Sequence, residues 1–148
     1  MDNYFIQPAT QNDFPAIRAL IHAVHINPTG LNWQRFMVAR SYDGEILGCG
    51  QIKRHTDGSL ELASIAVREQ DRGRGIARAV IERLLAGEDQ RPLYLICRAR
   101  LGILYERFGF RKIYFIEMPK YFQRLSRIER LINQASAEED RLLIMRLD

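Results

Sequence analysis

Short, mostly apolar runs separated by turn residues or by helical patterns occur along the chain, as is typical of β-strands. The pattern predicts strands at residues 4–6, 36–42, 46–52, 60–67, 93–97, 111–117 and 142–147. Asp43-Gly44 and Asp57-Gly58 predict hairpin turns on either side of the strand at 46–52. The strand at 60–67 is apolar on both faces apart from Glu61 and Ser64, which predicts a central, buried position.

Apolar residues at helical spacing predict a second set of elements. Helices are expected at residues 14–24, 76–85, 103–108 and about 119–135. Asn12 or Asp13 can cap the first of these, and Gly109 is a natural stop for the third. The order of elements predicts an α/β fold with a mixed, mostly antiparallel sheet, in a single domain over residues 1–148.

The predicted helix at about 119–135 is an extra amphipathic element between the last two strands. Its apolar positions begin at Tyr121, and Arg124, Arg127 and Arg130 lie on the other side. Three roles stay open for it. It packs its apolar face on the sheet, which we favour, or it forms a lid over a substrate, or it makes a dimer contact.

Composition narrows the class of protein. The chain has 148 residues, 47% hydrophobic and 27% charged, with no apolar run long enough to span a bilayer and no basic segment followed by an apolar stretch at its start. We therefore expect a cytoplasmic protein without membrane partners. Cys49 and Cys97 fit small buried side chains, and the cysteines and histidines lack metal-ligand spacing, so no metal is expected. The net charge of +4 suits an anionic ligand as well as it suits nucleic acid.

The most informative segment is the turn that leads from the strand at 60–67 into the next helix. Gly73 and Gly75 carry no side chains, so backbone N–H groups at the positive end of a helix can approach a phosphate closely. Positive charge beside this turn comes from Arg68, Arg72, Arg74 and Arg78. A dinucleotide fingerprint would need glycine where Arg78 stands, and a P-loop would need G-K-[ST]. The segment instead fills every position of the acyl-CoA turn [RQ]-x-x-G-x-[GA], as Arg72-Gly73-Arg74-Gly75-Ile76-Ala77.

A second motif, Tyr105-Glu106-Arg107-Phe108-Gly109-Phe110, has the form Y-E-x-x-G-F. With both motifs and the order of elements, the chain resembles the GNAT superfamily of acyl-CoA-dependent N-acetyltransferases from about Ile6 to Leu147. The resemblance implies a central split in the sheet, helices on both faces, and acetyl-CoA as cosubstrate. It also implies that pantetheine pairs with Ile65, Ala66 and Val67 and that the diphosphate binds at Arg72, Gly73, Arg74, Gly75, Ile76 and Ala77. Three positions depart from the family pattern: Arg68 replaces a usual proline, Arg98 a frequent asparagine, and Leu101 a common alanine.

Acetyl transfer to a primary amine needs a proton acceptor, an oxyanion donor and an acid for the leaving thiolate. Glu61 is the candidate base, on the strand face that also carries Ile65; the alternative is a solvent-facing glutamate near a turn. Tyr105 is the candidate acid; the alternative is a tyrosine packed beside Phe108 and Phe110. The family likeness assigns the oxyanion donor to the Ile65 N–H.

Other functions and partners stay open. A non-catalytic acyl-CoA sensor or scaffold is the main alternative, with Arg98 as its support, and a nucleic-acid binder ranks below it because no aromatic residues are interleaved with the helix arginines. The acceptor amine is a small molecule or a protein, and the chain is a monomer or a homodimer. Trp33, with Asn32 and Gln34, lines the acceptor site or the core. His22, His25 and His55 are expected to be ordinary surface or helix-edge residues.

Overall fold

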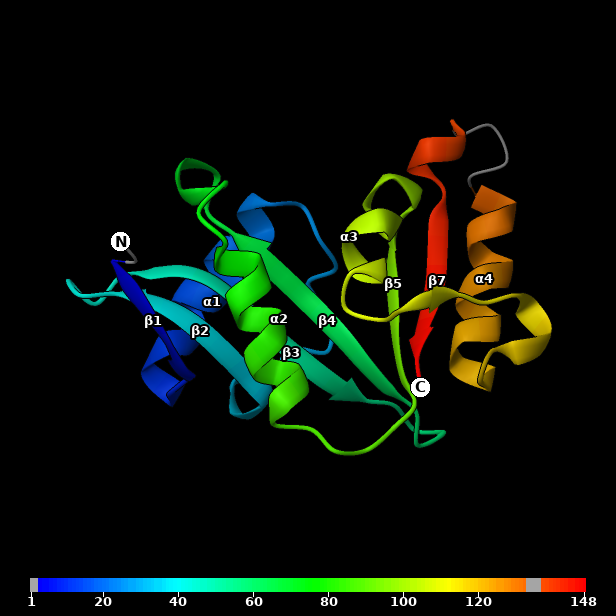
Figure 1. The fold of residues 1–148 in the computed structure, drawn as a ribbon, viewed down its shortest axis with the longest axis horizontal. Coiled ribbons are helices and arrows are strands. Elements are labelled where there is room, and N and C mark those ends of the chain that lie inside the picture. Colours follow the sequence, from blue (N-terminus) through cyan, green and yellow to red (C-terminus); the bar gives the residue numbers. More distant parts are fainter. Residues whose placement is uncertain (1–2, 133–136) are drawn as a thin grey trace. The chain divides into compact units, whose positions relative to one another are not determined.

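The computed structural model describes residues 3–132 and 137–148 of the chain (Figure 1). The strands are β1 Tyr4–Pro8, β2 Phe36–Ser41, β3 Ile46–Arg54, β4 Leu60–Val67, β5 Leu93–Arg98, β6 Arg111–Lys112 and β7 Leu142–Leu147. The α-helices are α1 Phe14–Ala23, α2 Ile76–Ala86, α3 Gly102–Glu106 and α4 Lys120–Ile132. The strand order in the mixed sheet is β1-β2-β3-β4-β5-β7-β6. The chain divides into two compact units, residues 1–53 with 62–89 and residues 54–61 with 90–148.

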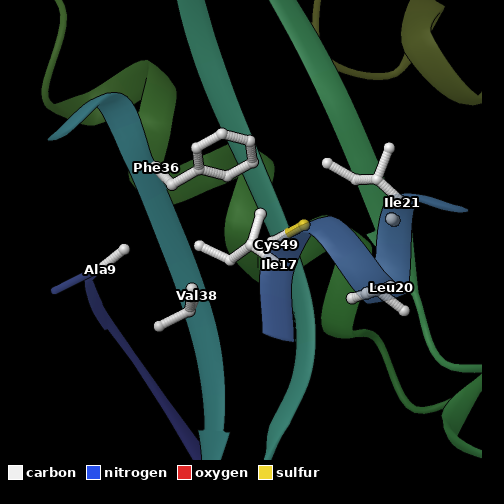
Figure 2. Close-up of a cluster of buried hydrophobic side chains, with 8 residues drawn as sticks. Ala9, Ile17, Leu20, Ile21, Phe36, Val38 and Cys49 are labelled. Atoms are coloured by element: carbon white, nitrogen blue, oxygen red, sulfur yellow. The ribbon is translucent and has the colours of Figure 1, made fainter. Parts of the chain in front are cut away.

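In the first unit, α1 covers one face of the strands β2 and β3. Its buried residues Ile17 and Ile21 lie one helical turn apart, and they pack on Phe36, Val38 and Cys49 (Figure 2). Val38 and Cys49 are partners in the antiparallel register of β2 with β3, so their side chains share this face. Burying each large apolar side chain of this cluster stabilises the fold by about 1.5–3 kcal/mol.

The opposite face of the same strands is covered by α2. Gly48 and Gly50 alternate with Cys49 along β3, and the space that their side chains would fill is occupied from α2 and β4. A Cβ at Gly48 would lie 2.7 Å from Cγ2 of Ile76, and a Cβ at Gly50 would lie 2.5 Å from Cδ1 of Ile65. The missing side chains therefore let α2 pack close to the sheet.

The second unit has the same arrangement on a smaller scale. β7 pairs antiparallel with β5 over Leu93↔Leu147 to Arg98↔Leu142, and with β6 on its other side. One core cluster of this unit consists of Tyr94, Ile113, Phe122 and Ile144, with α4 contributing Phe122. On the alternate positions, Leu143 of β7 lies against Gly102 of α3. Helices therefore cover both faces of the strands within each unit, which confirms the predicted α/β class.

The parallel part of the sheet is the pairing of β4 with β5. The register of these two strands consists of Leu60↔Leu93 and Glu61↔Tyr94, so the remaining residues of β4, Leu62 to Val67, extend beyond the last of these pairs. The parallel pairing therefore involves only the first two residues of β4.

An irregularity also lies within β4. Ser64 has φ +60°, a left-handed conformation that is rare for residues other than glycine. Its Oγ accepts a hydrogen bond of 2.8 Å from the buried Nε2 of Gln51, which also donates to the Gly30 carbonyl. The extended geometry is interrupted at Ser64, between Glu61 and Ile65. The two-residue period of a strand therefore does not place these two side chains on one face, although the sequence predicted that it would.

Most predicted elements are confirmed, but the strand expected at 111–117 is wrong beyond Lys112. The chain turns at Tyr114 and continues as the 3-10 turn Phe115–Glu117. The reason is a local side-chain cap, since Glu117 accepts a hydrogen bond of 3.0 Å from the Tyr114 N–H and pairs with Arg111. The helix expected at about 119–135 is confirmed as α4, and its positions 133–135 lie outside the described residues.

Candidate active site

The turn that enters α2 has the backbone geometry of an anion site. Gly73 and Gly75 have φ +81° and +78°, where a side chain would cost roughly 1–2 kcal/mol. A Cβ at either position would meet no described atom within 4 Å, so the space beside this backbone is open. Gly75 is the N-cap of α2 and has no side chain with which to cap it, so the first-turn amides remain available as donors. This arrangement suits a phosphate or diphosphate group.

The buried carboxylate of Asp71 accepts hydrogen bonds from an arginine on each side of it in the chain. Asp71 is 6% exposed; its Oδ2 accepts from Nε of Arg68 at 2.6 Å and its Oδ1 accepts from Nη1 of Arg74 at 2.7 Å. Arg68 also donates to Glu45 on the β2–β3 hairpin. The hydrogen bond from Arg68, joined by the one from Arg74 and opposed by burial, holds the pKa of the Asp71 carboxylate below its usual value. Asp71 was not among the predicted site residues.

These ion pairs change the expected charge of the site. Arg68 and Arg74 share the carboxylate of Asp71, and Arg78 pairs with Glu82 at 2.8 Å. Their positive charge is therefore partly offset, while Arg72 is exposed at the turn itself. An anion bound here would be held mainly by backbone amides and Arg72, rather than by a ring of four free arginines.

The three β4 residues that the family resemblance places beside pantetheine lie directly before this turn. Ala66 belongs to the core cluster beneath α1, and Ile65 and Val67 face the glycines of β3 on the α2 side. The side chains of these three residues therefore pack against other parts of the fold. The backbone is the part of this segment that can recognise a ligand, as the resemblance implies.

Glu61 has a close partner that the sequence did not reveal. Its side chain is 9% exposed, and its Oε1 lies 2.7 Å from Nε2 of His55, which follows β3 directly in the β3–β4 hairpin. The Asp57-Gly58 turn brings the two residues together, since the His55 N–H donates to the Ser59 carbonyl at 2.9 Å. His55 was expected to be an ordinary surface residue, and its buried contact with Glu61 shows that this was wrong. Polar residues on both sides of a predicted hairpin turn were the available signal.

Tyr105 is half-buried on α3, where its ring meets Phe110 edge to face at 6.3 Å. Burial, with a smaller contribution from the Cys97 side chain, raises the pKa of Tyr105 to about 12. The phenol therefore keeps its proton at neutral pH. Such a group can donate a hydrogen bond or a proton to a developing anion.

Two other residues singled out in the sequence are held by local contacts. Nη1 of Arg98 donates to the Asp140 carbonyl at 2.7 Å, which anchors its guanidinium within the second unit. Trp33 is half-buried in the 3-10 turn Trp33–Arg35, which Asn32 caps by accepting from the Gln34 N–H at 3.1 Å.

The chain is an α/β protein with a mixed sheet and, before α2, a turn with the backbone geometry of an anion site. A family model described as an acetyltransferase (GNAT) domain matches residues 32–112, more than half of the chain. The chain belongs to the GNAT acetyltransferases. The matched region contains Glu61, the acyl-CoA turn and Tyr105.

Solved structures share this fold at low sequence identity. Rv2747 from Mycobacterium tuberculosis, in complex with CoA and NLQ, is 21% identical with a TM-score of 0.70, over 97% of this chain and 98% of that one. N-acetylglutamate synthase from Neisseria gonorrhoeae, complexed with coenzyme A and N-acetyl-glutamate, is 20% identical with a TM-score of 0.73. All of this chain is covered in that comparison, but it spans only 36% of the synthase. A protein from Corynebacterium glutamicum ATCC 13032, described as histone acetyltransferase HPA2 and related acetyltransferase, is 21% identical with a TM-score of 0.67, over 98% and 96% of the two chains. No match was found among the curated proteins.

Residues 3–132 and 137–148 contain neither a metal-binding cluster nor a membrane-spanning helix. Within these ranges, no group of three or more histidine, cysteine or acidic side chains is arranged to hold a metal ion. No helix there combines the length and the apolar character that crossing a bilayer would require.

Proposed function

We propose that the protein transfers an acetyl group from acetyl-CoA to a primary amine by direct attack. The observation that carries the proposal is the turn before α2, where two left-handed glycines leave helix N-terminal amides open to an anion in a member of the GNAT family. In this proposal, Arg72 to Ala77 hold the diphosphate, and the backbone of Ile65 to Val67 holds pantetheine.

Glu61 is the proposed proton acceptor and Tyr105 the proposed acid. Glu61 takes a proton from the acceptor ammonium, and the neutral nitrogen attacks the carbonyl carbon of the thioester that acetyl-CoA supplies. As the C–N bond forms and the C–S bond breaks, the Tyr105 phenol gives its proton to the leaving sulfur and regains one from the nitrogen. The Ile65 N–H is the proposed donor to the oxyanion.

The first experiment measures binding of acetyl-CoA by isothermal titration calorimetry. Gly73→Asp places a carboxylate beside the bound diphosphate, so we expect at least about a tenfold loss of affinity, equal to 1.4 kcal/mol. Gly44→Asp is the matched control, because Gly44 also has a positive φ, of +91°, and open space around its Cβ position. Absence of acetyl-CoA binding at sub-millimolar concentration, or equal losses in both variants, would contradict the proposed site.

The second experiment measures thiol release with a panel of amines. The panel begins with glutamate and other amino acids, because one structural neighbour is an N-acetylglutamate synthase, and continues with polyamines and lysine-containing peptides. Acetylation of one of these amines supports the proposal. Tight binding of acetyl-CoA without acetylation of any amine would instead favour the sensor or scaffold.

A further inference from the structure

A buried polar cluster lies where the β3–β4 hairpin meets the first turn of α4, all within the second unit. At its centre, Nε2 of His55 and Oε1 of Glu61 are 2.7 Å apart, with side chains 11% and 9% exposed. Burying a carboxylate is costly unless a partner compensates for its lost hydration. The imidazole of His55 is that partner.

The helix α4 fixes the plane of this imidazole. The rings of His55 and Tyr121 stack with centroids 3.5 Å apart and planes at 14°, and Phe122 meets His55 edge to face at 5.7 Å. The Tyr121 N–H donates to Oδ2 of Asp57 at 3.0 Å, which ties the start of the helix to the hairpin turn. Contacts on the ring face and on the ring edge therefore determine where Nε2 points.

The charged groups around the cluster come from three segments. Glu61 is on β4, Asp57 is in the hairpin turn, and Tyr121 and Arg124 are on α4. Burial raises the pKa of Tyr121, and the negative charges of Glu61 and Asp57 act in the same direction against Arg124. The Tyr121 phenol therefore stays protonated and neutral, and the stacked ring adds no competing charge next to the carboxylate.

We propose that His55 is a positioning residue for Glu61, and that α4 holds His55 in place through the ring of Tyr121. The proposal rests on the proposed function, in which Glu61 accepts the proton of the acceptor amine. His55 donates Nε2–H to Oε1 and keeps that proton throughout, so Oε2 is left to take the proton from the ammonium nitrogen. The helix between the last two strands thus helps to build the base, in addition to packing on the sheet.

The kinetic test compares two substitutions at one position. His55→Ala removes the donor, and misplacement of the base should lower kcat by up to about 10²-fold without raising KM for acetyl-CoA. His55→Gln restores an N–H donor near the position of Nε2, so it should recover most of the lost activity. His22→Ala, at an exposed histidine of α1, is the matched control and should leave kcat unchanged. Wild-type activity in His55→Ala would overturn the proposal, and so would a His55→Gln protein as inactive as His55→Ala, because the histidine would then carry the proton itself.

A structural readout does not depend on turnover. By NMR, the Nε2 proton of His55 should exchange slowly with water in the wild type and in Tyr121→Phe, which keeps the stacked ring. The signal should disappear in Glu61→Ala and in Tyr121→Ala, and it should persist in Tyr114→Ala, where the tyrosine is 66% exposed.

The two readouts separate the two hypotheses. Active protein without a protected Nε2 proton refutes the positioning role while the proposed function stands. A protected proton in a protein that acetylates no amine refutes the proposed function, and the positioning role of His55 with it, and leaves the contact as a purely structural one.

Discussion

Asp71→Asn tests whether the buried carboxylate organises the acyl-CoA turn. The substitution keeps the size of the side chain but removes its charge, and it turns an amide N–H₂ toward an arginine that needs an acceptor. Each hydrogen bond to a charged group is worth about 1.5–3 kcal/mol when buried, and exposed ion pairs about 0–1 kcal/mol. The pairs here lie between these limits, since the Asp71 side chain is 9% exposed and those of Arg68 and Arg74 are 28% and 35% exposed. About 1 kcal/mol for each pair gives a loss of roughly 2 kcal/mol in unfolding free energy.

Two assays measure this loss. In thermal denaturation, about 2 kcal/mol corresponds to a decrease of roughly 4–8 °C in Tm for a chain of this size. In calorimetry, acetyl-CoA should bind about tenfold more weakly, because binding must then also order a looser turn. Asp43→Asn, at an exposed position of the neighbouring hairpin, is the control and should change neither quantity.

The stability that the Asp71 carboxylate contributes should depend on pH. The pKa of the Asp71 carboxylate is lowered by its hydrogen bonds from Arg68 and Arg74, so the stability that it contributes is fully present above the unfolded-state pKa. That stability is lost as the pH falls through the folded-state pKa. Wild type and Asp71→Asn should therefore differ by the full amount at pH 7 and converge below about pH 4. Tighter acetyl-CoA binding by Asp71→Asn would refute the reasoning, because it would mean that the released arginines bind the diphosphate better than the ordered turn does.

Two further predictions concern the acid and the close approach of α2 to the sheet. Tyr105→Phe should lower kcat by about 10²-fold at unchanged KM for acetyl-CoA. Because the pKa of Tyr105 is about 12, ionisation of the phenol should cause no loss of wild-type kcat up to pH 10. Equal kcat values in the two proteins would exclude Tyr105 as the acid. Gly50→Ala should cost about 1–3 kcal/mol of unfolding free energy in denaturant titrations, because the new Cβ would lie 2.5 Å from Cδ1 of Ile65. Gly87→Ala, whose Cβ would make only ordinary contacts, is its control, and equal stability of both variants would contradict this account.

The elements of the fold could be predicted well because most of their signals are local. The apolar run after the Asp57-Gly58 turn predicted β4 at Leu60–Val67 with the bounds that the structure has, and helical spacing predicted the apolar face of α1. The strand after Gly109 was predicted too long because β-propensity competes there with a side-chain cap. That cap depends on Glu117 reaching back to Tyr114 and Arg111, which alternation does not reveal.

The candidate site was predictable where its chemistry resides in one continuous segment. The acyl-CoA turn is such a segment, since its glycines, its helix start and its charges follow one another in the chain. The pairing of those charges was not predictable, because the conformation of the turn decides that Arg68 and Arg74 both donate to Asp71. The same holds for the candidate base. Glu61 could be predicted from its place on the strand, but its contact with His55 could not.

The sequence alone determined the α/β class, the acyl-CoA turn and the resemblance to the GNAT family, because periodicity and contiguous motifs are properties of neighbouring residues. Only the tertiary structure decided which side chains meet across elements. It brought His55 to Glu61, stacked Tyr121 of α4 on that imidazole, and placed Ser64 in a left-handed conformation supported by Gln51. Each of these contacts joins residues on different elements, and such contacts form only when the core fixes the elements side by side.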